Sequence, residues 1–173
     1  LLGQQMTFLT DAGVFSKKMI DYGSRVLLSA LEFNKKETLL DVGCGYGTLG
    51  LTLAKAQELE VTLVDINQRA LDLARKNADA NQVSADIFQS NVYEHVTGQF
   101  HHIISNPPIR AGKQVVHEVI SGSYDHLLAD GDLTIVIQKK QGAPSAKAKM
   151  EEVFGNCETL KKDKGYYILR SVK

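Results

Sequence analysis

Asn106, Pro107 and Pro108 are the residues whose types and order most suggest chemistry, and they follow the apolar pair Ile103 and Ile104. The prolines cannot donate backbone hydrogen bonds and have a fixed φ, so a strand through the isoleucines must end before them. An amide side chain is therefore placed at a strand end, on stiff backbone. An amide that is fixed in this way could position a ligand for reaction. The simpler interpretation is that these residues only terminate the strand.

Three glycines at alternating positions, Gly43, Gly45 and Gly47, form a second feature with chemical meaning. They follow an apolar run that predicts a buried strand, and a helical pattern comes directly after them. Glycine lets the backbone turn sharply and approach a ligand closely. Asp65 lies 18 residues beyond Gly47, at the end of the next apolar run. A carboxylate there can accept hydrogen bonds from both ribose hydroxyls, so the pattern indicates a nucleoside cofactor rather than a tight turn alone.

Asp41, two residues before the glycine loop, bears on which nucleoside cofactor is bound. A dinucleotide site usually reads G-x-G-x-x-G and sets a pyrophosphate on the helix N-terminus, whereas this loop reads G-x-G-x-G. A carboxylate at Asp41 would repel a pyrophosphate but could hold an ammonium group. S-Adenosylmethionine has a ribose, a cationic amino acid end and no phosphate, so we expect it in preference to a nicotinamide dinucleotide.

The elements that must position these residues alternate between strand and helix along most of the chain. The expected strands span 37–43, 59–65, 84–90, 100–106 and 131–139, with two more around a Lys164–Gly165 turn within 157–173. The expected helices span 48–57, 67–82, 113–129 and 145–155. This order predicts an α/β fold with a doubly wound, mostly parallel seven-stranded sheet and a C-terminal antiparallel hairpin. Ligands of such sheets bind at the carboxyl ends of the strands.

We expect a single domain over residues 1–173, because this length suits one core and the sequence has no repeat or linker. Residues 1–35 would cap the site with a lone strand at 4–10 and a helix at 16–33, and residues 36–173 would form the cofactor-binding and catalytic core. No apolar run reaches the roughly 18 residues that span a bilayer, and no signal-peptide pattern is present, so we expect a cytoplasmic protein without a membrane partner. The histidines and cysteines lack metal-ligand spacing, so no metal is expected.

From about Glu37 to its end, the chain resembles the class I S-adenosylmethionine-dependent methyltransferases, in the glycine loop, in Asp65 and in the final hairpin. The resemblance implies the Rossmann-like methyltransferase fold, with the hairpin at the edge of the sheet. It assigns Asp41 and the three loop glycines to the methionine part of the cofactor, Asp65 to the ribose and Ile66 to the adenine. Asn91 stands nearest to the position where the family often has an aspartate that contacts the adenine amino group.

In this family, Asn-Pro-Pro after the fourth strand marks enzymes that methylate a planar, conjugated nitrogen: adenine N6, cytosine N4, guanine N2 or a glutamine amide. The resemblance thus makes Asn106, Pro107 and Pro108 the expected catalytic residues. They would orient a nitrogen whose delocalised lone pair makes it a poor nucleophile.

Segments 13–28 and 106–113 together resemble more closely the bacterial small-subunit (16S) ribosomal RNA guanine-N2 methyltransferase family, as a short single-domain member. This resemblance implies that Phe15 and Ser16 line the substrate pocket, supported by Asp21, Gly23 and Ser24. Ile109 departs from the aromatic residue that is usual after the prolines. Phe15 could supply the missing stacking face, or it could simply belong to the core.

Basic residues gather after the Asn-Pro-Pro motif, where residues 106–173 carry 11 Lys and Arg against 8 Asp and Glu. Residues 1–105 carry 9 against 12. A basic surface near a site attracts phosphate. Arg110 and Lys113 flank the expected catalytic loop, and the Lys139–Lys140 pair follows the fifth strand. These cations are therefore candidates for RNA phosphate contacts, with ordinary solvated charges as the alternative.

The sequence thus predicts a methyltransferase that acts on guanine N2, with ribosomal RNA or the small ribosomal subunit as its partner. One alternative is a protein glutamine N5-methyltransferase, which would usually bring an N-terminal helical domain and an aromatic residue at position 109. The other is a non-catalytic RNA- or cofactor-binding module. Such a module would have a damaged glycine loop or no Asn-Pro-Pro, and both motifs are intact.

Overall fold

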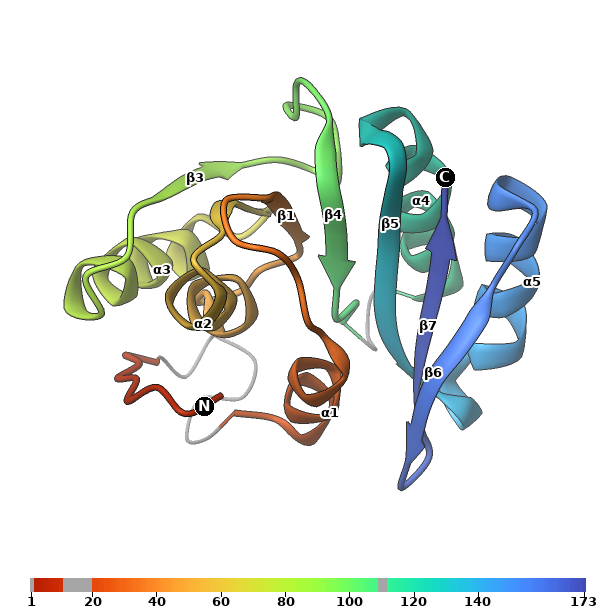
Figure 1. The fold of residues 1–173 in the computed structure, drawn as a ribbon, viewed down its shortest axis with the longest axis horizontal. Helices are drawn as coiled ribbons and strands as arrows, with labels where there is room; N and C mark the ends of the chain where they lie inside the picture. Colours follow the sequence, from red (N-terminus) through yellow and green to blue (C-terminus); the bar gives the residue numbers. More distant parts are fainter. Residues whose placement is uncertain (1, 11–19, 109–111) are drawn as a thin grey trace.

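The computed structural model describes residues 2–10, 20–108 and 112–173, and its centre is a seven-stranded mixed sheet (Figure 1). The strands lie in the order β3-β2-β1-β4-β5-β7-β6. Their bounds are β1 Thr38–Val42, β2 Glu60–Asp65, β3 Ala85–Gln89, β4 Phe100–Ser105, β5 Leu127–Gln138, β6 Glu158–Asp163 and β7 Tyr166–Val172. β1 to β5 pair in parallel, whereas β7 runs antiparallel to both β5 and β6. The predicted fold class is confirmed.

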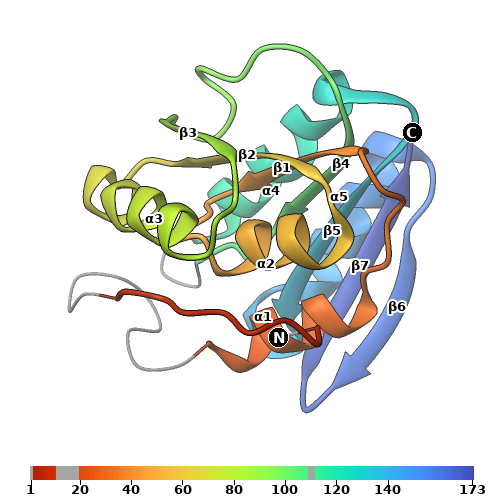
Figure 2. The same ribbon diagram turned by 60° about the vertical axis from the view of Figure 1, so that its left-hand side comes forward.

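Helices cover both faces of the sheet, with α1, α2 and α3 on one face and α4 and α5 on the other (Figure 2). Their bounds are α1 Tyr22–Ala30, α2 Thr48–Gln57, α3 Gln68–Ala80, α4 Gly112–Ser123 and α5 Ala143–Phe154, with short 3₁₀ turns η2 Tyr124–His126 and η3 Lys139–Gln141. Because β2, β1 and β4 are parallel neighbours, their carboxyl ends meet at one edge of the sheet. Asp65 ends β2 at this edge, and the segments after β1 and β4 carry the glycine loop and Asn106.

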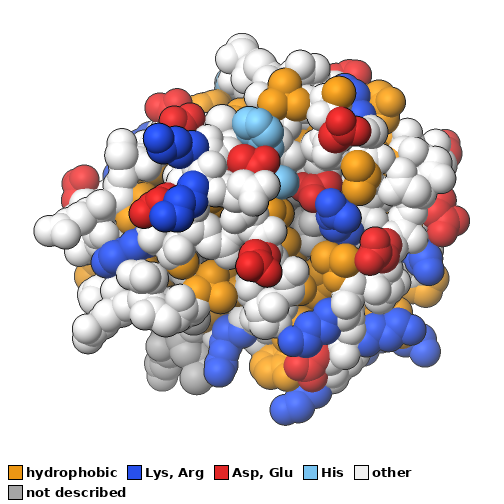
Figure 3. Space-filling view, viewed as in Figure 1, with side chains coloured by type: hydrophobic (Ala, Val, Ile, Leu, Met, Phe, Trp, Pro, Cys, Tyr) orange, Lys and Arg blue, Asp and Glu red, His pale blue; other side chains and the backbone are white. Residues whose placement is uncertain are grey.

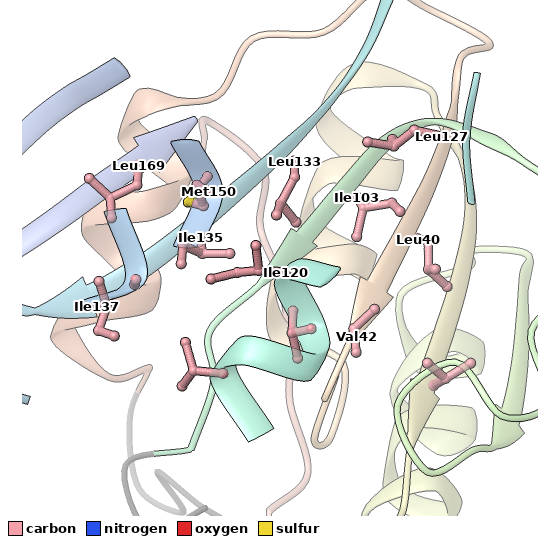
Figure 4. Close-up of a cluster of buried hydrophobic side chains, with 14 of the residues drawn as sticks. Leu40, Val42, Ile103, Ile120, Leu127, Leu133, Ile135, Ile137, Met150 and Leu169 are labelled. Atoms are coloured by element: carbon pink, nitrogen blue, oxygen red, sulfur yellow. The ribbon is translucent and has the colours of Figure 1, made fainter. Parts of the chain in front are cut away.

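A large hydrophobic cluster between the sheet and α4 and α5 holds these strands in place (Figure 4). Leu40 of β1 and Ile103 of β4 are fully buried there, and Ile120 of α4 and Met150 of α5 pack in the same cluster. Leu39 belongs to the cluster on the opposite face, as strand alternation requires. Each such side chain contributes about 1.5–3 kcal/mol by its burial, so the strand ends beside the site rest on a stable frame.

The C-terminal hairpin turns at the predicted pair, Lys164 and Gly165. Both residues have positive φ, 49° and 83°, which is the backbone of a two-residue turn whose twist matches the flanking strands. The Gly165 carbonyl accepts a hydrogen bond of 2.9 Å from the Lys139 N–H. The hairpin turn therefore lies against the chain that leaves β5.

The helix predicted at 113–129 ends earlier, at Ser123, and β5 begins at Leu127 rather than at residue 131. The early part of β5 contains an irregularity in its pairing with β4. Asp130 has a φ of 67°, and a Cβ at Gly131 would lie 2.8 Å from two backbone carbonyl oxygens. This Asp-Gly pair marks a bulge inside the strand, whereas the sequence prediction took it for the strand's beginning.

The lone strand predicted at 4–10 is wrong, because this segment forms no strand in the structure. Two buried asparagines bind its backbone instead: Asn77 of α3 and Asn81, the C-cap of that helix. Asn81 accepts from the Thr7 N–H at 2.9 Å and donates to the Thr7 carbonyl at 2.7 Å. Asn77 binds Leu9 in the same way, at 2.6 and 3.1 Å. These amides satisfy the backbone groups that a neighbouring strand would otherwise satisfy.

Helix α1 is shorter than the helix predicted at 16–33, since within the described residues it spans only Tyr22 to Ala30. Asp21 is its N-cap, and one carboxylate oxygen accepts from the Ser24 N–H at 3.0 Å. Capping by a short acidic side chain stabilises a helix start at this position. The part of the prediction before residue 20 lies outside the described residues.

Candidate active site

The glycine loop after β1 presents its backbone to open space. Gly43 and Gly45 have φ of 74° and 57°, in the left-handed region that favours glycine. A Cβ at either position would meet no atom of the described residues within 4 Å, so among these residues a ligand can approach this backbone closely. Gly47 differs, because a Cβ there would lie 2.7 Å from Leu51 Cδ1. The first two glycines leave room for a ligand, and the third allows α2 to pack.

Asp41 lies beneath the loop, with only 1 % of its surface exposed. Its Oδ2 accepts from the Gly50 N–H at 3.1 Å, and its Oδ1 has no hydrogen-bond partner among the described residues. Burial raises the pKa of Asp41 to about 7; the Gly50 N–H opposes the rise and the charge of Asp65 adds to it. A buried carboxylate with an unpartnered oxygen gains from a cationic ligand group.

Asp65 ends β2 at the same edge and is half-buried. Its Oδ2 accepts from the Gly45 N–H at 2.8 Å and its Oδ1 from the Asn67 N–H at 2.9 Å. These bonds fix the carboxylate, and each oxygen keeps a lone pair for a hydroxyl group. Ile66 beside it is 62 % exposed, the largest fraction among the exposed large hydrophobic side chains of the described residues. The pair offers acceptors for a sugar and an apolar surface for a flat base.

Asn91 follows β3 and is exposed. The chain before it is tied to the end of β2, since the Ser90 N–H donates to the Asp65 carbonyl at 3.0 Å. The Gln89 side chain also donates to the Ile66 carbonyl, at 2.8 Å. The structure therefore brings Asn91 to the edge that carries Asp65 and Ile66.

Asn106 is oriented by α1 through its amide nitrogen. Nδ2 donates to Asp21 Oδ1 at 3.2 Å and to Ser24 Oγ at 2.9 Å. Ser24 Oγ in turn donates to Asp21 Oδ2 at 2.8 Å. Because a carboxylate only accepts hydrogen bonds, the amide nitrogen must face Asp21, and the amide oxygen is turned away from it. This arrangement gives an atomic reason for the supporting role that the resemblance implied for Asp21 and Ser24.

The end of β4 is also tied to the end of β1. Ser105 Oγ donates to the Val42 carbonyl at 2.7 Å, directly before the glycine loop. Pro107 is buried and Pro108 is exposed, so the first proline anchors the turn and the second reaches the surface. The predicted catalytic residues thus adjoin the predicted cofactor loop at one edge of the sheet.

The structure describes one of the four predicted substrate-binding residues. Lys113 is exposed in the first turn of α4. Phe15, Ser16 and Arg110 lie outside the described residues, as does Ile109. Their roles stay predictions.

Sequence reasoning missed Asn77 and Asn81, which hold the N-terminal segment beside the site. Asn77 Nδ2 also donates to the Tyr46 carbonyl within the glycine loop, at 2.9 Å. One side chain therefore joins the loop, α3 and the segment 4–10. The sequence does contain one sign of this role. Two asparagines lie one turn apart inside the predicted helix, where asparagine is unfavourable unless its side chain has hydrogen-bond partners.

Two classes of feature are not found in the described part of the chain. No group of three or more His, Cys, Asp or Glu within it could hold a metal ion. None of its helices has the length and apolar character needed to cross a membrane.

Comparisons with known proteins match nearly the whole chain. It is 47 % identical over 178 residues to the uncharacterised Bacillus subtilis protein YbxB, covering 100 % of this chain and 89 % of that one. It is 37 % identical over 174 residues to the ribosomal RNA small subunit methyltransferase C of Erwinia tasmaniensis, covering 98 % of this chain and 50 % of the other. This chain therefore spans about half the length of that relative.

Solved structures agree with these relatives. The T. thermophilus 16S rRNA N2 G1207 methyltransferase (RsmC), in complex with AdoMet and guanosine, superposes with a TM-score of 0.92 at 30 % identity, over 100 % of this chain and 48 % of that one. The family model described as the methyltransferase small domain matches residues 5–170. With the glycine loop, Asp65 and Asn106 at one sheet edge, this match shows that the chain belongs to the methyltransferase small domain family.

Proposed function

We propose that this protein transfers a methyl group from S-adenosylmethionine to the exocyclic N2 amino group of a guanine in 16S ribosomal RNA. The observation that carries the proposal is the oriented amide of Asn106, whose nitrogen is held by Asp21 and Ser24. Its oxygen can then accept a hydrogen bond from an amino group at the sheet edge. Relatives named as small-subunit rRNA methyltransferases, and the solved relative with guanosine, support the choice of guanine.

The edge formed by β1 and β2 fits S-adenosylmethionine. Among the described residues, nothing fills the space beside Gly43 and Gly45, which leaves room for the methionine part. Asp41 Oδ1 has no partner among the same residues, which suits the ammonium group. Asp65 would accept from the ribose hydroxyls, and exposed Ile66 would lie against the adenine near Asn91. When bound there, S-adenosylmethionine supplies an electrophilic methyl group.

Asn106 and Pro107 act by positioning the amino group. A guanine N2 nitrogen has a delocalised lone pair and is a poor nucleophile. The Asn106 oxygen and the Pro107 carbonyl each accept one of its N–H groups, which aims the lone pair and stabilises positive charge growing on nitrogen. Pro107 and Pro108 keep the two acceptors stiff, so little reorganisation is needed during transfer. The proton can leave to water afterwards, so no strong base is required.

The RNA side of the proposal rests on residues at the mouth of the site. The target base must be unpaired or flipped out of its helix to reach Asn106. Phe15 and Ser16, within a cap formed by residues 1–35, would line its pocket, and Arg110 and Lys113 would contact phosphates. The partner would be ribosomal RNA or the small ribosomal subunit in the cytoplasm.

The test is transfer of label from S-adenosylmethionine to small ribosomal subunits, naked 16S rRNA and a release factor, assayed side by side. The proposal predicts labelled N2-methylguanosine after digestion of one of the RNA samples. Label on a protein glutamine would establish the glutamine methyltransferase instead. Cofactor binding without label in any sample would refute catalysis and identify a binding module.

A further inference from the structure

Five exposed cations lie around the end of β5, the β6–β7 turn and the first turns of α1. They are Arg25, Lys139, Lys140, Lys162 and Lys164, here called the basic ridge. The ridge brings together segments that are distant in sequence: the Lys139 N–H donates to the Gly165 carbonyl, next to Lys164, at 2.9 Å. Figure 3 shows Lys and Arg side chains gathered along the lower edge of the molecule, where Figure 1 places the hairpin turn.

None of the five ridge cations forms an ion pair with a carboxylate within residues 20–108 and 112–173. Some cations elsewhere in these ranges do form such pairs. The paired cations include Lys35 with Glu58, Arg75 with Asp72, Lys149 with Glu152 and Arg170 with Asp132. Within the described residues, the ridge is therefore a surface whose positive charge is not neutralised by ion pairs, on a chain of net charge zero.

Two carboxylates near the ridge are already engaged. Asp21 accepts hydrogen bonds from Ser24 and Asn106. Asp163 accepts a hydrogen bond from the Tyr22 hydroxyl. This hydrogen bond, followed by burial, raises the pKa of that tyrosine. Neither carboxylate makes an ion pair with a ridge cation in the described ranges, and five cations against two carboxylates leave the ridge with a positive balance of charge.

Two of the ridge lysines lie over tyrosine rings. Lys164 Nζ lies 5.1 Å from the centre of the Tyr22 ring, and Lys162 Nζ lies 4.9 Å from that of Tyr167. The rings of Tyr22 and Tyr166 are 5.6 Å apart, centre to centre. Cations over aromatic rings keep their charge at the surface, and half-buried rings among cations are typical of surfaces that bind single-stranded nucleic acid.

The ridge begins beside the proposed catalytic residue. Tyr22 directly follows Asp21, whose carboxylate holds Asn106. On the sheet, β5 is the next strand to β4, so Lys139 and Lys140 leave the sheet one strand away from Asn106, and β7 and β6 continue outward. Strands lie about 5 Å apart, so the ridge extends on the order of 10–15 Å from the site.

We propose that the basic ridge binds backbone phosphates of the substrate RNA, on one side of the nucleotide delivered to Asn106. Its chemistry suits this partner: exposed ammonium and guanidinium groups that outnumber the nearby carboxylates contact phosphates and do not read bases. This proposal adds an RNA-binding surface to the proposed function, and it rests on that function for the identity of the RNA.

The experiment compares the variant Lys139→Gln/Lys140→Gln/Lys164→Gln with a control of equal charge change, Lys35→Gln/Lys36→Gln/Lys76→Gln, whose positions lie before β1 and on α3. The dissociation constant of a fluorescein-labelled single-stranded 16S rRNA fragment is measured by anisotropy over a range of salt. Each phosphate contact to a single strand contributes about 0.7 to the slope of log affinity against log salt. The ridge variant should lose about 2 from this slope. The control variant should keep the wild-type slope.

A wild-type slope in the ridge variant would refute the proposal that the ridge binds RNA phosphates. An equal loss of slope in the control variant would also refute it, because the effect would then come from net charge. Thermal midpoints and S-adenosylmethionine affinities equal to those of the wild type would show that both variants are folded. Since binding is measured without turnover, a wild-type protein that binds RNA through the ridge but forms no N2-methylguanosine would refute the proposed function alone.

Discussion

At the scale of single residues, the site depends on which atom of each side chain faces the ligand. The Asn-Pro-Pro motif and the glycine loop could be recognised from sequence because proline and glycine restrict or free the backbone in known ways. The orientation of the Asn106 amide could not be recognised, because it comes from Asp21 and Ser24, more than 80 positions earlier in the chain.

Asp21→Asn tests this orientation. Asparagine caps a helix as well as aspartate does, so we expect little change in thermal stability. It can also donate hydrogen bonds, so it no longer forces the Asn106 amide into one orientation. We predict a fall in kcat on the order of 100-fold, the cost typical of misplacing a reacting group, with an unchanged KM for RNA. A loss of stability that accounts for the whole loss of activity would show that Asp21 only supports the fold.

Asp41 should make cofactor affinity depend on pH. Burial raises its pKa to about 7, so the carboxyl is neutral below that pH and charged above it. Only the charged form attracts an ammonium group. The affinity for S-adenosylmethionine should therefore fall as pH drops below 7, approaching about tenfold per unit. Calorimetric titrations between about pH 5.5 and 8 measure this. The variant Asp41→Asn should bind weakly at every pH, and a flat wild-type profile would exclude the contact.

At the scale of elements, periodicity located the strands and helices of the core, because their buried faces repeat every two or 3.6 residues. Periodicity placed the beginning of the fifth strand at Gly131, which lies inside β5, and it predicted a strand at residues 4–10, where none forms. The backbone of that segment hydrogen-bonds to side chains of α3 and of its C-cap residue, and no local pattern records such a long-range partner. The hairpin at Lys164 and Gly165 was predictable because its turn chemistry is local.

Asn77→Ala should release the N-terminal segment. Its side chain binds both backbone groups of Leu9 and the Tyr46 carbonyl, so its loss leaves buried polar groups without partners. We expect destabilisation of about 1–3 kcal/mol and faster hydrogen exchange at the Leu9 amide. The matched control is Gln68→Ala, since Gln68 is exposed on the same helix. Unchanged exchange at Leu9 would contradict the role of Asn77.

A charge cluster at the amino ends of the strands should make stability depend on pH. His102 Nδ1 lies 2.6 Å from Asp132 Oδ1, and Nε2 lies 3.0 Å from Glu37 Oε1. Burial lowers the pKa of His102, but the hydrogen bonds to Asp132 and Glu37 outweigh it and the net shift is upward. The stabilisation is therefore fully present below the unfolded-state pKa of about 6.5 and is lost as pH rises through the folded value.

Thermal unfolding across this pH window measures the effect. The wild-type midpoint should fall as pH rises above about 6.5, and the His102→Gln variant should lose that dependence. Parallel curves for the two proteins would show that another group is responsible.

At the scale of the whole molecule, the two ends of the sheet carry different chemistry. The amino ends hold the paired charges around His102, and the carboxyl ends hold the glycine loop, Asp65, Asn106 and the cations of the basic ridge. A net charge of zero conceals this division, and only the fold shows that cations from three segments share one edge. The arrangement suits an enzyme that holds a cofactor and an anionic polymer on the same side.

The most direct measurement is single-turnover methyl transfer to small-subunit RNA by the wild type and by Asn106→Ala, with cofactor affinity measured on the same samples. The wild type should form N2-methylguanosine, and the variant should be slower by about 1,000-fold while binding S-adenosylmethionine equally well. Transfer by the variant at the wild-type rate, or a wild-type product methylated at another atom, would contradict the central claim that Asn106 positions the guanine amino group.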